Sequence, residues 1–172
     1  MGTGGLFLRK LRAQVSNRPT GFVWVEQERL AGSGYPASRG QVEWVSANGI
    51  DAVLTLTQDP LPKAWTDGLG LSVEHVPMQD HGIPDAKVLD ECARLIEAKL
   101  DEGKSIMVHC LAGEGRTGCA LAAYLIRSKG LGADEALRRL RERKPEFVEL
   151  AQERAVSDYA ASLKRQPRSL NA

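Results

Sequence analysis

The apolar positions of the chain follow two periodicities that alternate along the sequence. Short apolar runs rich in β-branched residues, each bounded by turn-forming residues, predict strands. These runs cover residues 22–25, 29–32, 52–57, 71–76 and 105–109. The first two lie close together and are expected to form a hairpin. The run at 71–76 alternates more between apolar and polar residues, so we expect it nearer to an edge of a sheet.

Between these runs, apolar residues recur at helical spacing. Helices are therefore predicted over residues 38–48, 85–100, 116–128, 133–143 and 149–163. Ser38 and Asp85 carry side chains that cap helix N-termini, and Gly103 is a stop signal after the second helix. The helix at 116–128 is apolar almost all round, which predicts that it is buried in the centre of the protein.

The alternation of strands and helices indicates the class of fold. It predicts an α/β protein with a central, mostly parallel, twisted sheet of four to five strands flanked by helices. A length of 172 residues favours one domain with a proper core. We expect this domain at residues 21–163, with residues 1–20 forming an N-terminal arm or short helix and residues 164–172 a disordered tail.

The composition is that of an ordinary globular protein and gives no sign of a charged partner. Apolar residues make up 42% and charged residues 26% of the chain, and 23 Lys and Arg against 22 Asp and Glu leave a formal net charge of +1. This balance indicates neither a nucleic-acid nor a membrane partner. The three cysteines are too few for a disulfide framework, and no signal peptide or membrane-spanning run is recognised. We therefore expect a cytoplasmic protein with free thiols.

Residues 108–118 carry the candidate chemistry, in a glycine-rich loop between a predicted strand and a predicted helix. Backbone N–H groups in such a loop converge on a helix N-terminus and bind anions. Arg116, six residues after Cys110, can return across the loop and bind two phosphate oxygens. A helix N-terminus and a neighbouring arginine also favour the nucleophilic thiolate form of cysteine. The hydroxyl of Thr117 can donate to that sulfur. The expected phosphate-binding residues are Leu111, Ala112, Gly113, Glu114, Gly115 and Arg116.

The loop motif His109-Cys110-x-x-Gly113-x-x-Arg116-Thr117-Gly118 resembles the signature of the cysteine-based protein tyrosine phosphatase superfamily. The chain as a whole is similar to the small, single-domain, atypical dual-specificity phosphatases over roughly residues 22–163. The further segments that carry the similarity are Trp24, 29–32, 54–57, 78–82, 122–125 and 143–145. The resemblance implies a phosphatase fold and a two-step mechanism with Cys110 as nucleophile.

The resemblance also implies a general acid at Asp80. This residue follows a predicted strand, within a loop shaped by Gly82 and two prolines that can close as a unit. Asp85 is the rival carboxylate, but it opens a predicted helix and is better explained as an N-cap. We therefore assign proton donation to Asp80.

Three further residues have supporting roles by resemblance. His109 is expected to hydrogen-bond and support the loop rather than transfer protons. A glutamine before the last helix often helps to position the hydrolytic water in this family, and Gln152 matches it. Glu149 is a second candidate, because the chain is one residue shorter here than the family pattern. Both could equally be solvated residues of a first helical turn.

The sequence thus predicts a monomeric protein phosphatase that hydrolyses phosphotyrosine, and with it phosphoserine and phosphothreonine, through a cysteinyl-phosphate intermediate. Phosphorylated proteins or peptides are the expected partners, with phosphate or other oxyanions as product or inhibitor. We expect no cofactor, because no His/Asp cluster has metal-ligand spacing. Relatives that prefer inositol phosphates tend to carry lysine at the position of Glu114, so a carboxylate there is expected to disfavour such ligands.

Other classes of protein remain as alternatives. An RNA 5′-triphosphatase shares the signature loop, but the near-zero net charge and an apparent general acid are against it. A non-catalytic phosphate-binding module would be expected to lack Cys110, Arg116 or Asp80, and all three are present. A sulfurtransferase or an arsenate reductase could use a reactive cysteine in a similar loop, but the segment around Asp80 argues against both.

Overall fold

The computed structural model describes residues 17–165 as an α/β structure built on one sheet. Its five strands lie in the order β1-β2-β5-β3-β4. Their bounds are β1 Val23–Glu26, β2 Leu30–Ser33, β3 Ala52–Thr55, β4 Ser72–His75 and β5 Ile106–His109. The strands β1 and β2 form the expected antiparallel hairpin, and the other three pairs are parallel. The prediction of a mostly parallel sheet is confirmed, and β4 lies at an edge as expected.

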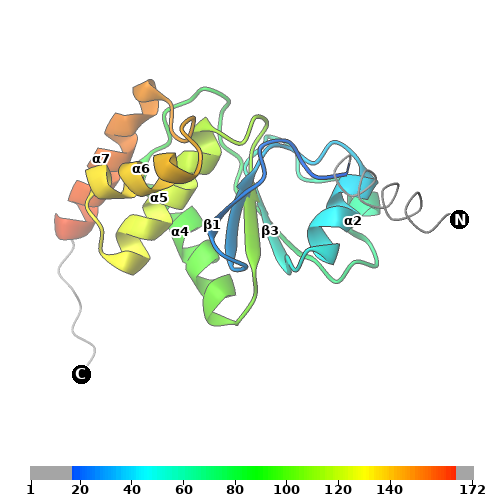
Figure 1. Ribbon diagram of the computed structural model, residues 1–172. Coiled ribbons are helices and arrows are strands. Elements are labelled where there is room, and N and C mark those ends of the chain that lie inside the picture. Colours follow the sequence, from blue (N-terminus) through cyan, green and yellow to red (C-terminus); the bar gives the residue numbers. More distant parts are fainter. Residues whose placement is uncertain (1–16, 166–172) are drawn as a thin grey trace, which may run out of the picture.

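Helices cover both faces of the sheet (Figure 1). Their bounds are α2 Arg39–Ala47, α3 Lys63–Thr66, α4 Ala86–Asp101, α5 Gly115–Lys129, α6 Ala133–Arg143, the 3₁₀ turn η1 Leu150–Gln152 and α7 Glu153–Arg165. Helices α4 to α7 gather on one face, and α2 lies on the other. Two apolar clusters fill the two layers between sheet and helices. Among the described helices, none combines the length and the apolar character that crossing a membrane requires.

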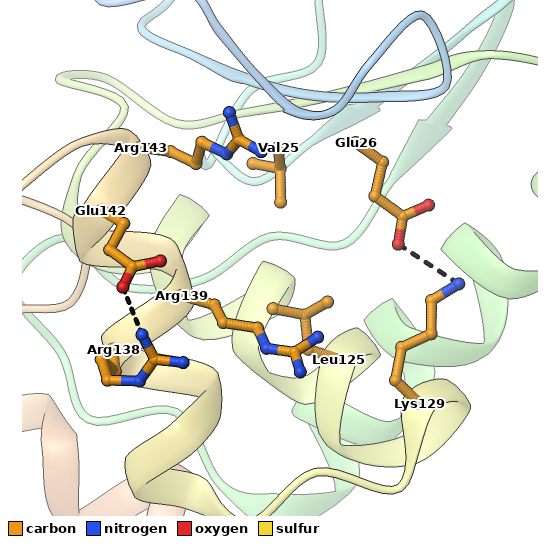
Figure 2. A pocket seen from close by; sticks show the side chains of 8 residues that line it. All are labelled: Val25, Glu26, Leu125, Lys129, Arg138, Arg139, Glu142 and Arg143. Carbon is orange, nitrogen blue, oxygen red and sulfur yellow. Dashed lines mark hydrogen bonds and ion pairs between the residues drawn. The ribbon is translucent and has the colours of Figure 1, made fainter.

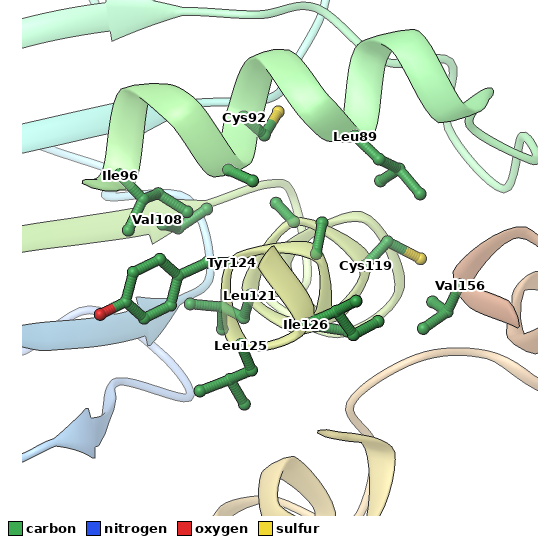
Figure 3. Packing of buried hydrophobic residues seen from close by; sticks show 14 of the residues in the cluster. Leu89, Cys92, Ile96, Val108, Cys119, Leu121, Tyr124, Leu125, Ile126 and Val156 are labelled. Carbon is green, nitrogen blue, oxygen red and sulfur yellow. The ribbon is translucent and has the colours of Figure 1, made fainter. Parts of the chain in front are cut away.

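The helix α5 is the centre of the larger layer. It is buried from Gly115 to Ile126, as its apolar sequence predicted. Figure 3 shows why: α4 contributes Leu89, Cys92 and Ile96 beside it, and α7 contributes Val156. Contacts on several sides require apolar residues around the whole helix. This packing fixes the N-terminus of α5 relative to the sheet.

Two predicted helix caps are formed. The Gln41 amide donates to Ser38 Oγ over 3.3 Å, and the Val88 amide donates to Asp85 Oδ1 over 2.8 Å. Each side chain satisfies a backbone donor that the first turn leaves unpaired. The carboxylate of Asp85 is therefore engaged at the start of α4, which agrees with its assignment as a cap.

Some predicted boundaries are wrong. The strand predicted over 52–57 ends at Thr55, although the Leu56 amide still donates to the His109 carbonyl over 2.9 Å. The last helix begins at Glu153 rather than 149, because a 3₁₀ turn precedes it. The same helix includes Lys164 and Arg165, so the predicted tail starts too early. The rest of that tail, 166–172, and residues 1–16 of the predicted arm lie outside the described residues.

The strand β5 occupies the middle of the sheet, paired with β2 on one side and β3 on the other. It ends at His109, and α5 begins six residues later at Gly115. The loop between them therefore lies at the carboxyl edge of the parallel strands. Open α/β sheets bind their ligands at this edge, which makes it the place to look for a site.

Candidate active site

The loop after β5 curves tightly around Cys110. The side chain of Cys110 is almost fully buried, and the Gly113 amide donates to its Sγ over 3.3 Å. Gly113 has a φ of +73°, and a Cβ atom there would lie 2.3 Å from the Gly34 backbone nitrogen. Only glycine fits this combination of positive φ and close approach. The local sequence thus shapes a loop that presents a backbone donor, the Gly113 amide, to the sulfur.

Arg116 joins this loop to the segment after β4. Its side chain is only 5% exposed. One guanidinium nitrogen, Nη1, donates to the Met78 carbonyl over 3.1 Å, and the other, Nη2, lies 2.6 Å from Asp80 Oδ1. Fixing a guanidinium at two points orients its planar donor set. The predicted phosphate clamp and the predicted acid are therefore in direct contact.

His109 lies beneath the loop, completely buried. Its Nδ1 is 3.3 Å from the Cys110 carbonyl, and its Nε2 is 2.9 Å from Thr55 Oγ1. A carbonyl only accepts, so Nδ1 carries the proton and Nε2 accepts from the threonine hydroxyl. Burial lowers the pKa of His109 to about 4, outweighing the opposing effect of its bond to the Cys110 carbonyl. The imidazole is thus a neutral support for the loop, in the position expected from the sequence.

A cavity of about 90 Å³ opens above the loop. Its lining residues are Asp80, His81, Cys110, Leu111, Ala112, Glu114, Gly115, Arg116 and Glu149. The structure therefore brings together the predicted nucleophile, clamp and acid, most of the predicted phosphate-binding loop and one of the two candidate water-positioning residues. Gly113, Thr117, His109 and Gln152 do not line the cavity.

Thr117 differs from expectation in its contacts. Its hydroxyl is completely buried and has no hydrogen-bond partner within the described part of the chain. The expected donation from Thr117 to Cys110 Sγ is therefore not made, and the Gly113 amide is the donor to that sulfur. A buried hydroxyl without a partner is unfavourable, and such groups are found at functional sites.

The two candidates for positioning water have different surroundings. Gln152 is buried, its Nε2 donates to the Gly82 carbonyl over 2.9 Å, and its Oε1 accepts from the Cys119 thiol over 3.6 Å. Both ends of its amide are therefore engaged. Glu149 is 39% exposed and faces the cavity. Of the two side chains, Glu149 is the one with access to a ligand in the cavity.

Two contributors to the site were not predicted. His81 Nδ1 lies 3.1 Å from Glu149 Oε1, and its Nε2 lies 4.0 Å from Asp80 Oδ2, so the imidazole lies between two carboxylates. Lys144 Nζ donates to the Gly113 carbonyl over 2.8 Å and holds the loop from outside. Both residues occur in segments that resemble the phosphatase family, at 78–82 and 143–145. That resemblance was the available signal, but it did not specify their contacts.

A larger cavity, of about 270 Å³, lies between β1, α5 and α6 (Figure 2). Four basic residues line it, but several of them are paired. Lys129 lies 3.3 Å from Glu26, and Arg138 pairs with both Glu135 and Glu142. This cavity contains no cysteine and no polar loop at a helix N-terminus. The candidate chemistry therefore belongs to the smaller cavity.

Residues 17–165 also contain no group of three or more His, Cys, Asp or Glu side chains placed to hold a metal ion. The acidic residues that line the candidate site lie instead beside basic side chains, Asp80 and Glu149 beside Arg116 and His81, and Glu114 at 3.9 Å from Lys144. Asp80 contacts Arg116 directly, and Glu149 contacts His81.

Comparisons with known proteins agree on one family. A family model described as a DSP-PTPase phosphatase of polymorphic toxin systems matches residues 32–130. The tyrosine-protein phosphatase cdcA of Emericella nidulans is 30% identical over 108 residues, which are 62% of this chain and 18% of that protein. Dual specificity protein phosphatase 12 of Rattus norvegicus is 31% identical over 105 residues, 60% of this chain and 31% of that protein. The chain thus matches about a fifth to a third of the length of these curated relatives.

Solved structures add agreement over nearly the whole fold. The crystal structure of a mutant form of Tk-PTP has a TM-score of 0.76 and 32% identity, and the match covers 83% of this chain and 96% of that one. The crystal structure of human DUSP28 has a TM-score of 0.71 and 21% identity, and the match covers 86% of this chain and 99% of that one. At this low identity the match shows the fold alone.

Proposed function

The chain belongs to the DSP-PTPase phosphatase family, and from this premise we propose that it hydrolyses phosphate monoesters on phosphorylated proteins through a cysteinyl-phosphate intermediate. One observation carries the proposal: Cys110, Arg116 and Asp80 line the same small cavity at the carboxyl edge of the sheet. Phosphotyrosine is the proposed substrate group, together with phosphoserine and phosphothreonine. The tyrosine and dual-specificity phosphatases among the relatives support this choice.

In the first step, Cys110 Sγ attacks phosphorus and the bond from phosphorus to the leaving oxygen breaks. Asp80 gives its proton to that oxygen, so the product leaves as an alcohol or phenol. Arg116 and the loop amides hold the remaining phosphate oxygens and stabilise their charge. Asp80 is paired with Arg116 in the structure, so the entering phosphoryl group must first replace it on the guanidinium, and Asp80 acts as the acid once it has taken a proton from solvent.

In the second step, water attacks the phosphocysteine and the sulfur–phosphorus bond breaks. Asp80, now a carboxylate, accepts the proton from water, and the sulfur leaves as a thiolate. We assign stabilisation of that thiolate to the Gly113 amide, which donates to Cys110 Sγ over 3.3 Å. Exposure to the cavity favours Glu149 over Gln152 for orienting the water.

A protein monoester fits the charges of the cavity better than a polyphosphate does. Asp80, Glu114 and Glu149 line its wall, against Arg116 as the buried cation. Extra phosphates would meet these carboxylates at short range. This arrangement disfavours RNA 5′-triphosphates and inositol polyphosphates as substrates. We further expect the domain to act as a monomer without a cofactor.

The test is hydrolysis of p-nitrophenyl phosphate and of paired phosphotyrosine and phosphoserine peptides in the presence of EDTA. We expect activity in the wild type and none in Cys110→Ser, and the peptide ratio then gives the specificity. Activity that persists in the variant would contradict the proposal. Inactivity of the wild type on every monoester, with hydrolysis of RNA 5′-triphosphate, would establish the triphosphatase alternative instead.

A further inference from the structure

Three large apolar side chains of residues 17–165 are strongly exposed. They are Ile83, Leu111 and Leu150, with exposed fractions of 66%, 60% and 83%. Single exposed apolar residues are common on protein surfaces and need no explanation. Here each of the three lies on a segment that also carries a residue of the candidate active site. Such a grouping around a polar site is typical of a binding surface.

The three segments meet at the cavity. Leu111 directly follows Cys110 and lines the cavity itself. Ile83 follows Gly82, whose carbonyl accepts from Gln152 on the segment before α7. Leu150 follows Glu149, whose carboxylate contacts His81 on the segment of Ile83. These contacts bring the three segments together beside the active-site cavity, which Leu111 lines, while Ile83 lines a neighbouring cavity with Gln79 and Pro84. We call Ile83, Leu111 and Leu150 the apolar rim.

We propose that the apolar rim binds bulky apolar side chains next to the phosphorylated residue of a peptide substrate, and so selects phosphopeptides with apolar flanking residues. This inference rests on the proposed phosphatase function. The phosphoryl group would enter the cavity, and the neighbouring side chains would then cover the rim. Each apolar contact removes surface from water on both partners and so favours the complex.

The charges beside the rim identify the kind of partner. Asp80, Glu114 and Glu149 line the cavity beside the apolar rim. An anionic membrane surface would bring many negative charges against these carboxylates. A peptide with apolar neighbours brings no charge beyond the phosphate. Acidic residues beside the phosphorylated residue are disfavoured for the same reason, which distinguishes this site from one that selects acidic motifs.

The experiment compares kcat/KM for two phosphotyrosine peptides that differ only at the flanking positions, leucine in one and serine in the other. The wild type should prefer the leucine peptide by about tenfold, as expected when one or two apolar side chains are partly removed from water. In the double variant Ile83→Ser, Leu150→Ser this preference should fall to near one. Hydrolysis of p-nitrophenyl phosphate, which is too small to reach across the rim, should stay the same.

The matched control is Ile83→Leu, Leu150→Met, which keeps apolar side chains of similar size and should keep the preference. Equal kcat/KM for the two peptides in the wild type would overturn the apolar rim while leaving the phosphatase function intact. Faster hydrolysis of phosphatidylinositol phosphate in anionic vesicles than of the leucine peptide would also overturn it. Wild-type protein that is inactive on p-nitrophenyl phosphate and on both peptides would overturn the proposed function and the inference with it. A dimer that the double serine variant dissociates would show that a second copy covers the rim, which is likewise against the proposal.

Discussion

The Arg116 guanidinium lies 2.6 Å from the Asp80 carboxylate, so the proposed phosphate clamp and the proposed general acid form one ion pair. The arginine is nearly buried, whereas the aspartate is about half exposed. A buried cation needs a counter-charge, because burial removes its solvation. Asp80 supplies this charge, and a phosphoryl group entering the cavity competes for the same guanidinium. Binding and proton donation are therefore coupled through this pair.

Replacing Asp80 by asparagine separates these two effects. Asp80→Asn removes the proton donor, so turnover of a substrate with a poor leaving group should fall by about 10²- to 10⁴-fold. The same change removes the competing anion, so inorganic phosphate should inhibit more strongly. Both quantities are measured by steady-state kinetics on phenyl phosphate.

The control for this substitution is Asp85→Asn. Asparagine caps a helix about as well as aspartate, so this variant should keep both wild-type turnover and wild-type inhibition. Wild-type turnover in Asp80→Asn, or an equal loss in Asp85→Asn, would show that the acid is assigned to the wrong carboxylate.

Gly113 should tolerate no side chain. Gly113→Ala places a Cβ 2.3 Å from the Gly34 nitrogen and at a φ of +73°, so the loop must move. Gly130→Ala is the matched control, because Gly130 has a φ of +66° but nothing within 4 Å of an added Cβ. The control should cost about 1 kcal/mol of unfolding free energy and keep activity. Gly113→Ala should cost clearly more and abolish turnover. Urea unfolding measures the loss of unfolding free energy in each variant, and steady-state kinetics measure kcat. An equal loss of unfolding free energy in Gly113→Ala and Gly130→Ala would contradict the close approach of residue 113 to Gly34.

Alkylation should distinguish the three cysteines. Burial raises the pKa of both Cys92 and Cys119 to about 12, and neither side chain is exposed. The thiolate is the reactive form, so these two thiols should be inert in the folded protein. Cys110 lines the cavity and should take up one equivalent of iodoacetamide, with protection by phosphate. Peptide mass mapping identifies the site, and rapid labelling of Cys92 or Cys119 would contradict the assignment.

Stability should depend on pH through His109. Its native pKa of about 4 lies below its usual value of 6.5, so the unfolded state binds more protons between these two pH values. The free energy of unfolding should therefore fall as pH is lowered through this range, by up to about 3 kcal/mol. Carboxylates with lowered pKa, such as Glu74, lose their contribution only below about 4.5, the usual value for a glutamate.

The matched variant for this effect is His109→Asn, which keeps a polar group beside Thr55 but does not titrate. Its free energy of unfolding should change less than that of the wild type between pH 6.5 and 4.5, as measured by urea titrations at each pH. Parallel curves for the two proteins would show that His109 is not the group responsible.

Local signals in the sequence predicted the framework well. Ser38 and Asp85 cap the helices that they were expected to cap, because a cap involves only residues within one turn. The helix α5 is buried as its all-round apolar pattern indicated. The helix α3, at Lys63–Thr66, was missed because it has four residues and no buried side chain to give a periodic signal.

Contacts between distant segments were beyond what the sequence pattern could specify. The signature loop identified Cys110 and Arg116, but the contact of Arg116 with Asp80 depends on how the segment after β4 folds over α5. His81 and Glu149 are 68 residues apart, and their contact depends on the packing of two loops. Spacing in one sequence carries no information on such pairs. The resemblance to known phosphatases identified the residues, and the structure gives the distances.

The central claim is that Cys110 carries the phosphoryl group between the two steps. It is tested most directly by acid-quenching the enzyme during turnover of p-nitrophenyl phosphate and mapping phosphate by mass spectrometry, with Asp80→Asn used beside the wild type to slow the steps that need Asp80. We predict one phosphoryl group, attached to the peptide that contains Cys110, and none in Cys110→Ser. Turnover with no phosphoryl group on Cys110 in either protein, or with phosphate on another residue, would contradict the account.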